Sequence, residues 1–239
     1  MADRFVWEQL GLELFSHEKY TLSNFYPGAN GEVLAAIEQW IAGGEPRLVH
    51  LWGTAASGKT HLLQAAINAI PEPQRAIYLP LRELCEQAPD ILEGIEDVPF
   101  VVVDDLEYCL TAAQWENRLF SLYNQQQNNG GRLILASRRR LLDLEFGLRD
   151  LQSRFESGLS LQVRALDDDG RRKLMGDKAR ALGCSLSETV MDYLLRHCSR
   201  DASDLMTLIE ALDKRSLRHS RAISVPMIKE HLAQSDAKP

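Results

Sequence analysis

The sequence has no long apolar run and few cysteines. None of its apolar segments approaches the ~18–20 residues that a membrane-spanning helix needs, so we expect no membrane association. Near residue 1 there is no basic stretch followed by an apolar one, so we expect no secretory signal. The four cysteines are widely spread without a C-x-x-C pair, which disfavours zinc binding: Cys85, Cys109, Cys184 and Cys198. We therefore predict reduced thiols in a cytoplasmic protein.

Positive charge is also in short supply. The 239 residues contain 27 lysines and arginines against 34 aspartates and glutamates, a net charge of −7. A protein dedicated to binding duplex DNA usually carries a basic patch, so we expect no strong direct DNA binding, although a local basic surface is compatible with this balance. We find no internal repeat and no low-complexity segment. The length suits one α/β domain with a small second unit.

The most informative stretch is GTAASGKT at residues 53–60, a full match to G-x-x-x-x-G-K-[ST]. An apolar run at 48–52 precedes it, and a helix-compatible run at 59–70 follows it. This context predicts a phosphate-binding loop in which Lys59 reaches the outer phosphates of a nucleotide and Thr60 binds Mg²⁺. We expect backbone N–H groups of the loop to face the phosphates, from the residues Gly53, Thr54, Ala55, Ala56, Ser57 and Gly58.

A second run, FVVVDDLE at residues 100–107, predicts a central strand that is buried on both faces and ends in two acids. Beside a phosphate-binding loop, a carboxylate in this place can hold magnesium, which we assign to Asp104. Asp105 is then the candidate for polarising the attacking water. The simpler alternative is an acidic strand end that faces solvent.

Strands and helices alternate between residues 47 and 163. Strands are predicted at 75–79, 100–104, 132–137 and 159–163, with a helix at 113–128 and a short one at 148–155. This alternation predicts an α/β fold with a parallel sheet. Four amphipathic helices are expected from residue 167 onward, forming a small all-helical unit, and 234–239 is expected to be disordered.

Two segments before the loop remain ambiguous from their residues. YTLSNFYPG at 20–28 is aromatic and turn-rich, and it either cups the nucleotide base, with Tyr26 as the candidate, or forms a small local core. Asn30 is expected to cap a helix through residue 43. QLGLEL at 9–14 alternates apolar and polar residues, which suits an edge strand or an extended peptide docked in a partner's groove.

Taken together, these motifs resemble the AAA+ ATPases, and among them the DnaA branch and the Hda family of DnaA-related regulators. TLSNFYPG at 21–28 is similar to the opening of the DnaA ATPase domain, and VVDDL at 102–106 to its Walker B strand. LQSRFESG at 151–158 is similar to its box VII, L-x-S-R-F-x-x-G. The resemblance covers residues 20–233 and implies an AAA+ sheet with a helical lid.

The resemblance implies specific partners and roles. Box VII would make Arg154 an arginine finger that acts on ATP bound to DnaA; on its residues alone Arg154 would be a surface ion-paired arginine. In the Hda family a Q-L-x-L-x-L peptide binds the sliding clamp, the β subunit of DNA polymerase III. The matching positions here are Gln9, Leu10, Leu12 and Leu14, with Glu13 in place of the usual proline. A homo-oligomer is also possible in this class.

Two departures from the DnaA pattern predict weak intrinsic ATP hydrolysis. Arg138 stands where the sensor 1 acid is usual, and Ser203 stands near the place of the sensor 2 arginine, with Arg200 one turn earlier. ADP or ATP with Mg²⁺ is the expected ligand. The rival interpretation is a helicase loader or remodelling ATPase with its own hydrolysis cycle.

The expected organisation has four parts: a clamp-binding segment 1–19, an AAA+ nucleotide-binding domain 20–165, a lid 166–233 and the tail 234–239. The sequence shows neither a DnaA-type helix-turn-helix domain nor an amino-terminal oligomerisation domain. The predicted function is regulation of replication initiation, in which clamp-bound protein stimulates hydrolysis of DnaA-bound ATP and so prevents re-initiation.

Overall fold

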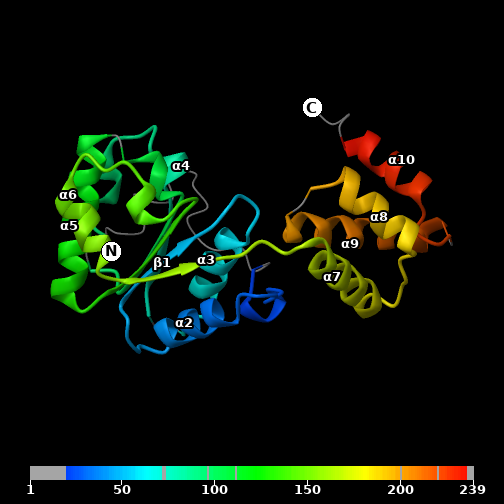
Figure 1. Cartoon of the computed structure of the whole chain (residues 1–239), viewed down its shortest axis with the longest axis horizontal. Coiled ribbons are helices and arrows are strands. Elements are labelled where there is room, and N and C mark those ends of the chain that lie inside the picture. The colour runs from blue at the N-terminus through cyan, green and yellow to red at the C-terminus, as the bar shows by residue number, and fades with distance from the viewer. Residues whose placement is uncertain are drawn as a thin grey trace. The chain divides into compact units, whose positions relative to one another are not determined.

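The computed structural model describes residues 20–71, 74–95, 97–110, 112–199, 201–219 and 221–235. It divides into two compact units, Met1–Arg164 and Ala165–Pro239, here called the sheet unit and the helical unit (Figure 1). The predicted docking peptide at 9–14 lies outside the described residues. Within the described ranges, no helix is long and apolar enough to cross a membrane.

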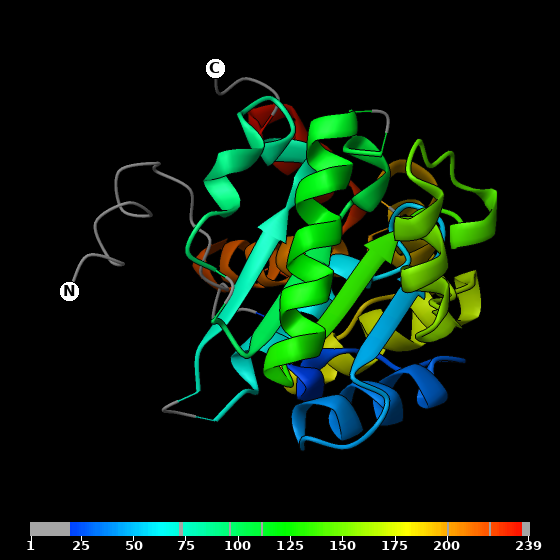
Figure 2. The ribbon, with the colours of Figure 1, turned by 90° about the vertical axis from the view of Figure 1, so that its left-hand side faces the viewer.

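The sheet unit contains five parallel strands in the order β2-β3-β4-β1-β5. They are β1 (Leu48–Trp52), β2 (Ala76–Pro80), β3 (Phe100–Asp104), β4 (Arg132–Ser137) and β5 (Leu159–Gln162). Figure 2 shows the strands behind the long helix α5 (Ala113–Asn129). The parallel α/β sheet predicted from the sequence is confirmed.

Helices cover both faces of the sheet. Helices α2 (Gly31–Ile41) and α3 (Lys59–Asn68) pack on one face, and α5 and α6 (Arg149–Glu156) pack on the other (Figure 1). Because side chains alternate along a strand, Val101 and Val103 of β3 pack on the α5 side while Val102 packs on the α3 side. Short helical turns complete the connections: η1 (Leu22–Asn24), α4 (Leu81–Leu84), η2 (Pro89–Leu92), η3 (Leu106–Tyr108) and η4 (Leu141–Asp143).

The residue before α2 does not do what the sequence predicted. Asn30 is in the capping position, but its side chain makes no capping hydrogen bond. Its Nδ2 instead donates to the carbonyl of Arg164 at 2.9 Å, and its Oδ1 accepts from the N–H of Arg164 at 2.8 Å. The prediction of a side-chain cap was wrong, because Asn30 is 98% buried against a segment that sequence proximity does not reveal.

The helical unit consists of α7 (Asp168–Ala181), α8 (Glu188–His197), α9 (Ala202–His219) and α10 (Val225–Ser235). Side chains cap the first two helices, since Asp167 accepts from the N–H of Gly170 and Ser187 from that of Val190. The apolar faces enclose one core that includes Met175, Val190, Leu194, Leu205, Ile209, Leu212 and Ile228. Helix α10 includes 234 and 235 of the predicted disordered tail, and 236–239 lie outside the described residues.

Candidate functional site

The loop at 53–60 connects β1 to α3 and leaves no room for side chains at its glycines. The N–H of Gly53 donates to the carbonyl of Ser137 at 3.2 Å, and a Cβ on Gly53 would lie 2.2 Å from the carbonyl oxygen of Val163. Gly58 has a φ of +95°, a left-handed conformation that disfavours other residues. The two glycines therefore give the loop its tight turn at the carboxyl edge of the sheet.

Lys59 is buried inside this loop. Its Nζ donates to the carbonyls of Gly53 at 2.8 Å and Thr54 at 2.9 Å. Burial lowers the pKa of Lys59, and nearby carboxylates, Asp104 first, act in the opposite direction. The loop carbonyls thus hold the ammonium group where the predicted phosphates would bind.

Asp104 at the end of β3 collects three donors. Thr60 Oγ1 donates to Asp104 Oδ2 at 2.7 Å, the hydroxyl of Tyr78 donates to the same oxygen at 2.8 Å, and the N–H of Asp105 donates to Oδ1 at 2.9 Å. Burial raises the pKa of the Asp104 carboxyl, and the Thr60 hydrogen bond lowers it. The structure therefore brings Thr60 and Asp104 into direct contact, as a shared role would require.

A hydroxyl and a carboxylate are hard oxygen ligands of the kind that Mg²⁺ prefers. The described part of the chain has no group of three His, Cys, Asp or Glu side chains that could hold a metal. The hydroxyl of Thr60 and the carboxylate of Asp104 fit a magnesium ion by their chemistry and their contact at 2.7 Å. Tyr78 was missed by sequence reasoning, and its only signal was an aromatic hydroxyl within the otherwise aliphatic strand β2.

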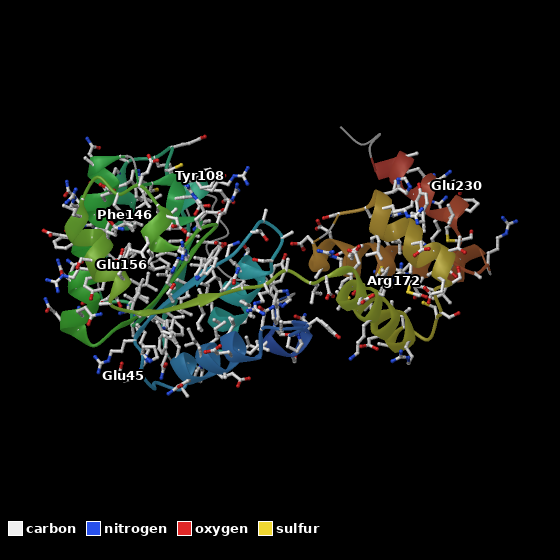
Figure 3. All side chains as sticks on the ribbon, in the orientation of Figure 1. Glu45, Tyr108, Phe146, Glu156, Arg172 and Glu230 are labelled. Atoms are coloured by element: carbon white, nitrogen blue, oxygen red, sulfur yellow. The ribbon has the colours of Figure 1, made fainter. Side chains whose placement is uncertain are left out.

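Asp105 begins the turn after β3 with a φ of +54°, a left-handed conformation that aspartate tolerates. Its side chain is half-buried. Beyond it, Glu107 pairs with Arg138 from the turn after β4, with 3.3 Å between Arg138 Nε and Glu107 Oε1. Arg138 also donates to the hydroxyl of Tyr108 at 3.1 Å, and Figure 3 labels this tyrosine in the sheet unit. Arg138, which we predicted to stand at the sensor 1 place, is thus paired with a glutamate that the sequence did not single out.

The aromatic segment at 20–28 rests on the start of α3. His61 makes edge-to-face contacts with the rings of Tyr20 at 5.1 Å and Phe25 at 5.4 Å between centroids. A Cβ on Gly58 would meet the Phe25 ring at 2.8 Å. Phe25 therefore contacts the phosphate-binding loop directly, while Tyr26, the residue singled out from the sequence, is half-buried.

A buried histidine ties three strands together behind the loop. His50 of β1 is fully buried; its Nε2 lies 2.8 Å from Ser137 Oγ and its Nδ1 lies 2.9 Å from Ser160 Oγ. Ser137 Oγ donates its proton to the carbonyl of Arg139 at 2.5 Å, so His50 Nε2 must be the donor and Nδ1 the acceptor. Burial lowers the pKa of His50 to about 4, which keeps the ring neutral near pH 7.

Arg154 is on the exposed side of α6. Leu151 and Phe155 on the other side are buried, and Gly158 packs so closely that a Cβ there would lie 2.5 Å from Leu48 Cγ. Within the described chain, the Arg154 guanidinium has no ion pair or hydrogen bond. Helix α6 packs on the sheet face opposite α3, so Arg154 does not lie beside Lys59, Thr60 and Asp104. It is firmly anchored and presented to solvent.

Several predicted positions are not described. Gln9, Leu10, Leu12 and Leu14 lie outside the described residues, as does Arg200. Ser203 belongs to α9, but its side chain is not described. The docking peptide and the sensor 2 region therefore stay predictions.

Two protein-family models match the chain. The model of the bacterial DnaA ATPase domain matches residues 16–162, well over half of the chain. The model of the Hda lid domain matches residues 168–232, which correspond to the helical unit. The two models meet near residue 165, where the two compact units also meet.

Solved structures agree with these matches. A replication initiator DnaA bound to AMPPCP and single-stranded DNA is 25% identical, with a TM-score of 0.72, over 86% of this chain and 69% of that one. AMPPCP-bound DnaA from Aquifex aeolicus is 26% identical, with a TM-score of 0.71, over 83% and 66%. Domain III of Thermotoga maritima DnaA shows the same fold at 22% identity, with a TM-score of 0.73, over 94% and 99%.

The chain thus spans about two thirds of the length of the first two initiator chains. The likeness covers both the parallel sheet with its flanking helices and the lid-type helical unit. The chain belongs to the bacterial DnaA ATPase-domain family, as an Hda-like AAA+ protein with a lid of the Hda type.

Proposed function

We propose that this DnaA-related AAA+ protein binds ATP or ADP with Mg²⁺ at residues 53–60. The support is the loop geometry, the buried Lys59 and the contact between Thr60 and Asp104. The AMPPCP in two similar initiator structures agrees with such a ligand. Mg²⁺ would screen phosphate charge, while Lys59 orients the outer phosphates and Asp105 orients water. With Arg138 paired to Glu107, we expect weak intrinsic hydrolysis.

We further propose that the protein regulates replication initiation by stimulating hydrolysis of ATP bound to DnaA. The observation that carries this proposal is Arg154, which is exposed on an anchored α6, has no ion pair among the described residues and lies within a sequence similar to box VII. An arginine supplied to a neighbouring nucleotide site stabilises charge on the transferring phosphoryl group. The division into a docking segment 1–19, an AAA+ domain 20–165 and a lid 166–233 is part of this proposal.

Residues 9–14 would tether the protein to the sliding clamp on DNA. An extended peptide with spaced apolar anchors is a common docking mode, and the anchors would be Leu10, Leu12 and Leu14 with Gln9 as the polar contact. Glu13 makes the peptide less preorganised than a proline would, which weakens binding.

The test is hydrolysis of DnaA-bound ATP in the presence of DNA-loaded clamp, with and without this protein. We expect stimulation by the wild type and its loss in Arg154→Ala, by roughly 10³-fold or more, as for other arginine fingers. Arg149→Ala changes another exposed arginine of α6 and is the matched control, with stimulation retained. Gln9→Ala/Leu10→Ala should lose the stimulation of hydrolysis if that stimulation depends on binding to the clamp.

The outcomes separate the proposal from its rival. If the wild type does not stimulate hydrolysis, or if Arg149→Ala fails as badly as Arg154→Ala, the finger proposal is wrong. The alternative, a helicase loader or remodelling ATPase, predicts turnover by the protein alone that Asp105→Asn abolishes.

A further inference from the structure

The helical unit carries a hollow lined by basic side chains. It has a volume of about 580 Å³ and lies between α9 and α10. The described residues that line it are Ala211, Lys214, Arg215 and Arg218 from α9 with His231 and Gln234 from α10. Ala211 lies one helical turn before Lys214 and Arg215, on the same side of α9.

One arginine of the hollow is fixed by neighbours. Arg215 donates to Glu230 Oε2 at 2.8 Å and to Gln234 Oε1 at 2.9 Å. Figure 3 labels Glu230 on α10. The carboxylate of Glu230 is thus in direct contact with Arg215, and no ion pair among the described residues joins it to Lys214 or Arg218.

The other two cations of the hollow, Lys214 and Arg218, have no ion-pair partner among the described residues. Within the described chain, their side chains make no hydrogen bond either. They are four residues apart on α9, so they face the same side and repel each other. A helix dipole favours cations only in the last turn, which accounts for Arg218 but not for Lys214. The pair thus leaves charge that a bound anion could balance.

The surrounding sequence strengthens the charge argument. Residues 214–221, KRSLRHSR, hold four lysines and arginines and no acid. The helical unit has 13 lysines and arginines against 12 acids, whereas the sheet unit has 14 against 22. Basic character is therefore concentrated in this part of an otherwise acidic chain.

We propose that this basic hollow binds the phosphate backbone of duplex DNA. Lys214, Arg215 and Arg218 are the charged residues of the described lining, so charge complementarity favours a polyanion such as the DNA backbone. Lysine and arginine without base-reading partners give sequence-independent contact, with dissociation constants of about 10⁻⁴–10⁻⁶ M at physiological salt. A weak contact of this kind agrees with the negative net charge of the whole chain.

The test uses the full chain and a fluorescein-labelled duplex of about 20 base pairs, a length chosen to exceed one helical turn. Fluorescence anisotropy is measured between 50 and 200 mM salt, a range in which backbone contacts weaken strongly. We expect Lys214→Glu/Arg218→Glu to lower affinity at least about 10-fold and to reduce the salt slope by about 2. Arg180→Glu/Arg196→Glu makes the same charge change elsewhere on the helical unit and should retain most of the binding.

Circular dichroism of both double variants checks that the helices still form. The proposal is overturned if the wild type does not bind the duplex, or if the two double variants lose affinity equally. It is also overturned if polyglutamate binds the hollow while the duplex does not, because the site would then serve an acidic polypeptide. None of these outcomes depends on nucleotide binding or on Arg154.

Discussion

The two units use charge in different ways. In the sheet unit, two of the buried charged groups, Lys59 and Asp104, lie with their hydrogen-bond partners at the carboxyl edge of the strands. Glu116 and Arg132 are also buried, each hydrogen-bonded to other residues. In the helical unit the ion pairs are largely at the surface, as with Arg172 and Asp192. Ion pairs at the surface contribute little to stability, whereas burying a charge is costly unless it is well paired. The helical unit also buries Arg171 and Asp213, so the contrast lies in the placement of Lys59 and Asp104 at the loop 53–60 rather than in buried charge as such.

The largest effect should come from truncating one large buried side chain in the core of each unit. Phe155→Ala removes a fully buried ring behind Arg154 and should lower the free energy of unfolding of the sheet unit by about 3–5 kcal/mol. Ile209→Ala should destabilise the helical unit by about 2–5 kcal/mol. Urea unfolding followed by tryptophan fluorescence reports only the sheet unit, because all four tryptophans precede residue 165.

We therefore expect Phe155→Ala to shift the tryptophan transition and Ile209→Ala to leave it in place while altering the circular dichroism transition. If the tryptophan transition shifts equally in both variants, the two units unfold together and are not independently stable.

The second largest effect should be a loss of stability at low pH, mainly in the sheet unit. The folded pKa of His50 is about 4, below the usual 6.5, so the unfolded chain binds the extra proton more readily. The contribution of His50 to stability is complete above pH 6.5 and is lost as the pH falls to 4, by about 3 kcal/mol. Unfolding by urea at pH 7.0 and 4.5 measures this loss.

The raised pKa of Asp104 acts in the opposite direction, because a carboxyl that holds its proton more tightly when folded gains stability in acid. Asp104 is present in both the wild type and His50→Gln, so its contribution cancels when the acid losses of the two proteins are compared. We expect a smaller acid loss in His50→Gln and an unchanged one in His197→Gln, whose histidine belongs to the helical unit. If the wild type, His50→Gln and His197→Gln lose the same free energy of unfolding between pH 7.0 and 4.5, His50 is not the source of the acid loss.

The smallest effect concerns one hydroxyl. Tyr78→Phe removes a hydrogen bond to the buried Asp104 carboxylate, and bonds to charged groups contribute about 1.5–3 kcal/mol. We expect the sheet unit to lose about 2 kcal/mol in urea unfolding, within that range. Tyr193→Phe in the helical unit is the control and should change the tryptophan transition little. If Tyr78→Phe is neutral, the hydroxyl bond does not stabilise the site.

The parts of the fold that follow from local patterns were predictable. The apolar run of β3, the glycines of the loop and the core stripe of α5 at Trp115 and Leu119 each determine their structure within a few residues. The same holds for the contact between Thr60 and Asp104, because parallel strands end at one edge of the sheet.

What sequence reasoning missed depends on contacts between distant segments. Asn30 binds Arg164, 134 residues later, and Arg138, after β4, pairs with Glu107 in η3, after the neighbouring strand β3. Tyr78 reaches Asp104 only because β2 and β3 are neighbours in register. Each is a polar side chain whose partner is fixed by the order of strands, which a pattern along the chain does not contain.

The pair of hydrogen bonds from Asn30 to Arg164 has a mechanical consequence. They hold both backbone polar groups of the last residue of the sheet unit, so that residue cannot turn freely about its own dihedral angles. Any hinge between the units must then begin at Ala165. A single side-chain amide, just before the first long helix, would thus set where the torsional freedom of the linker starts.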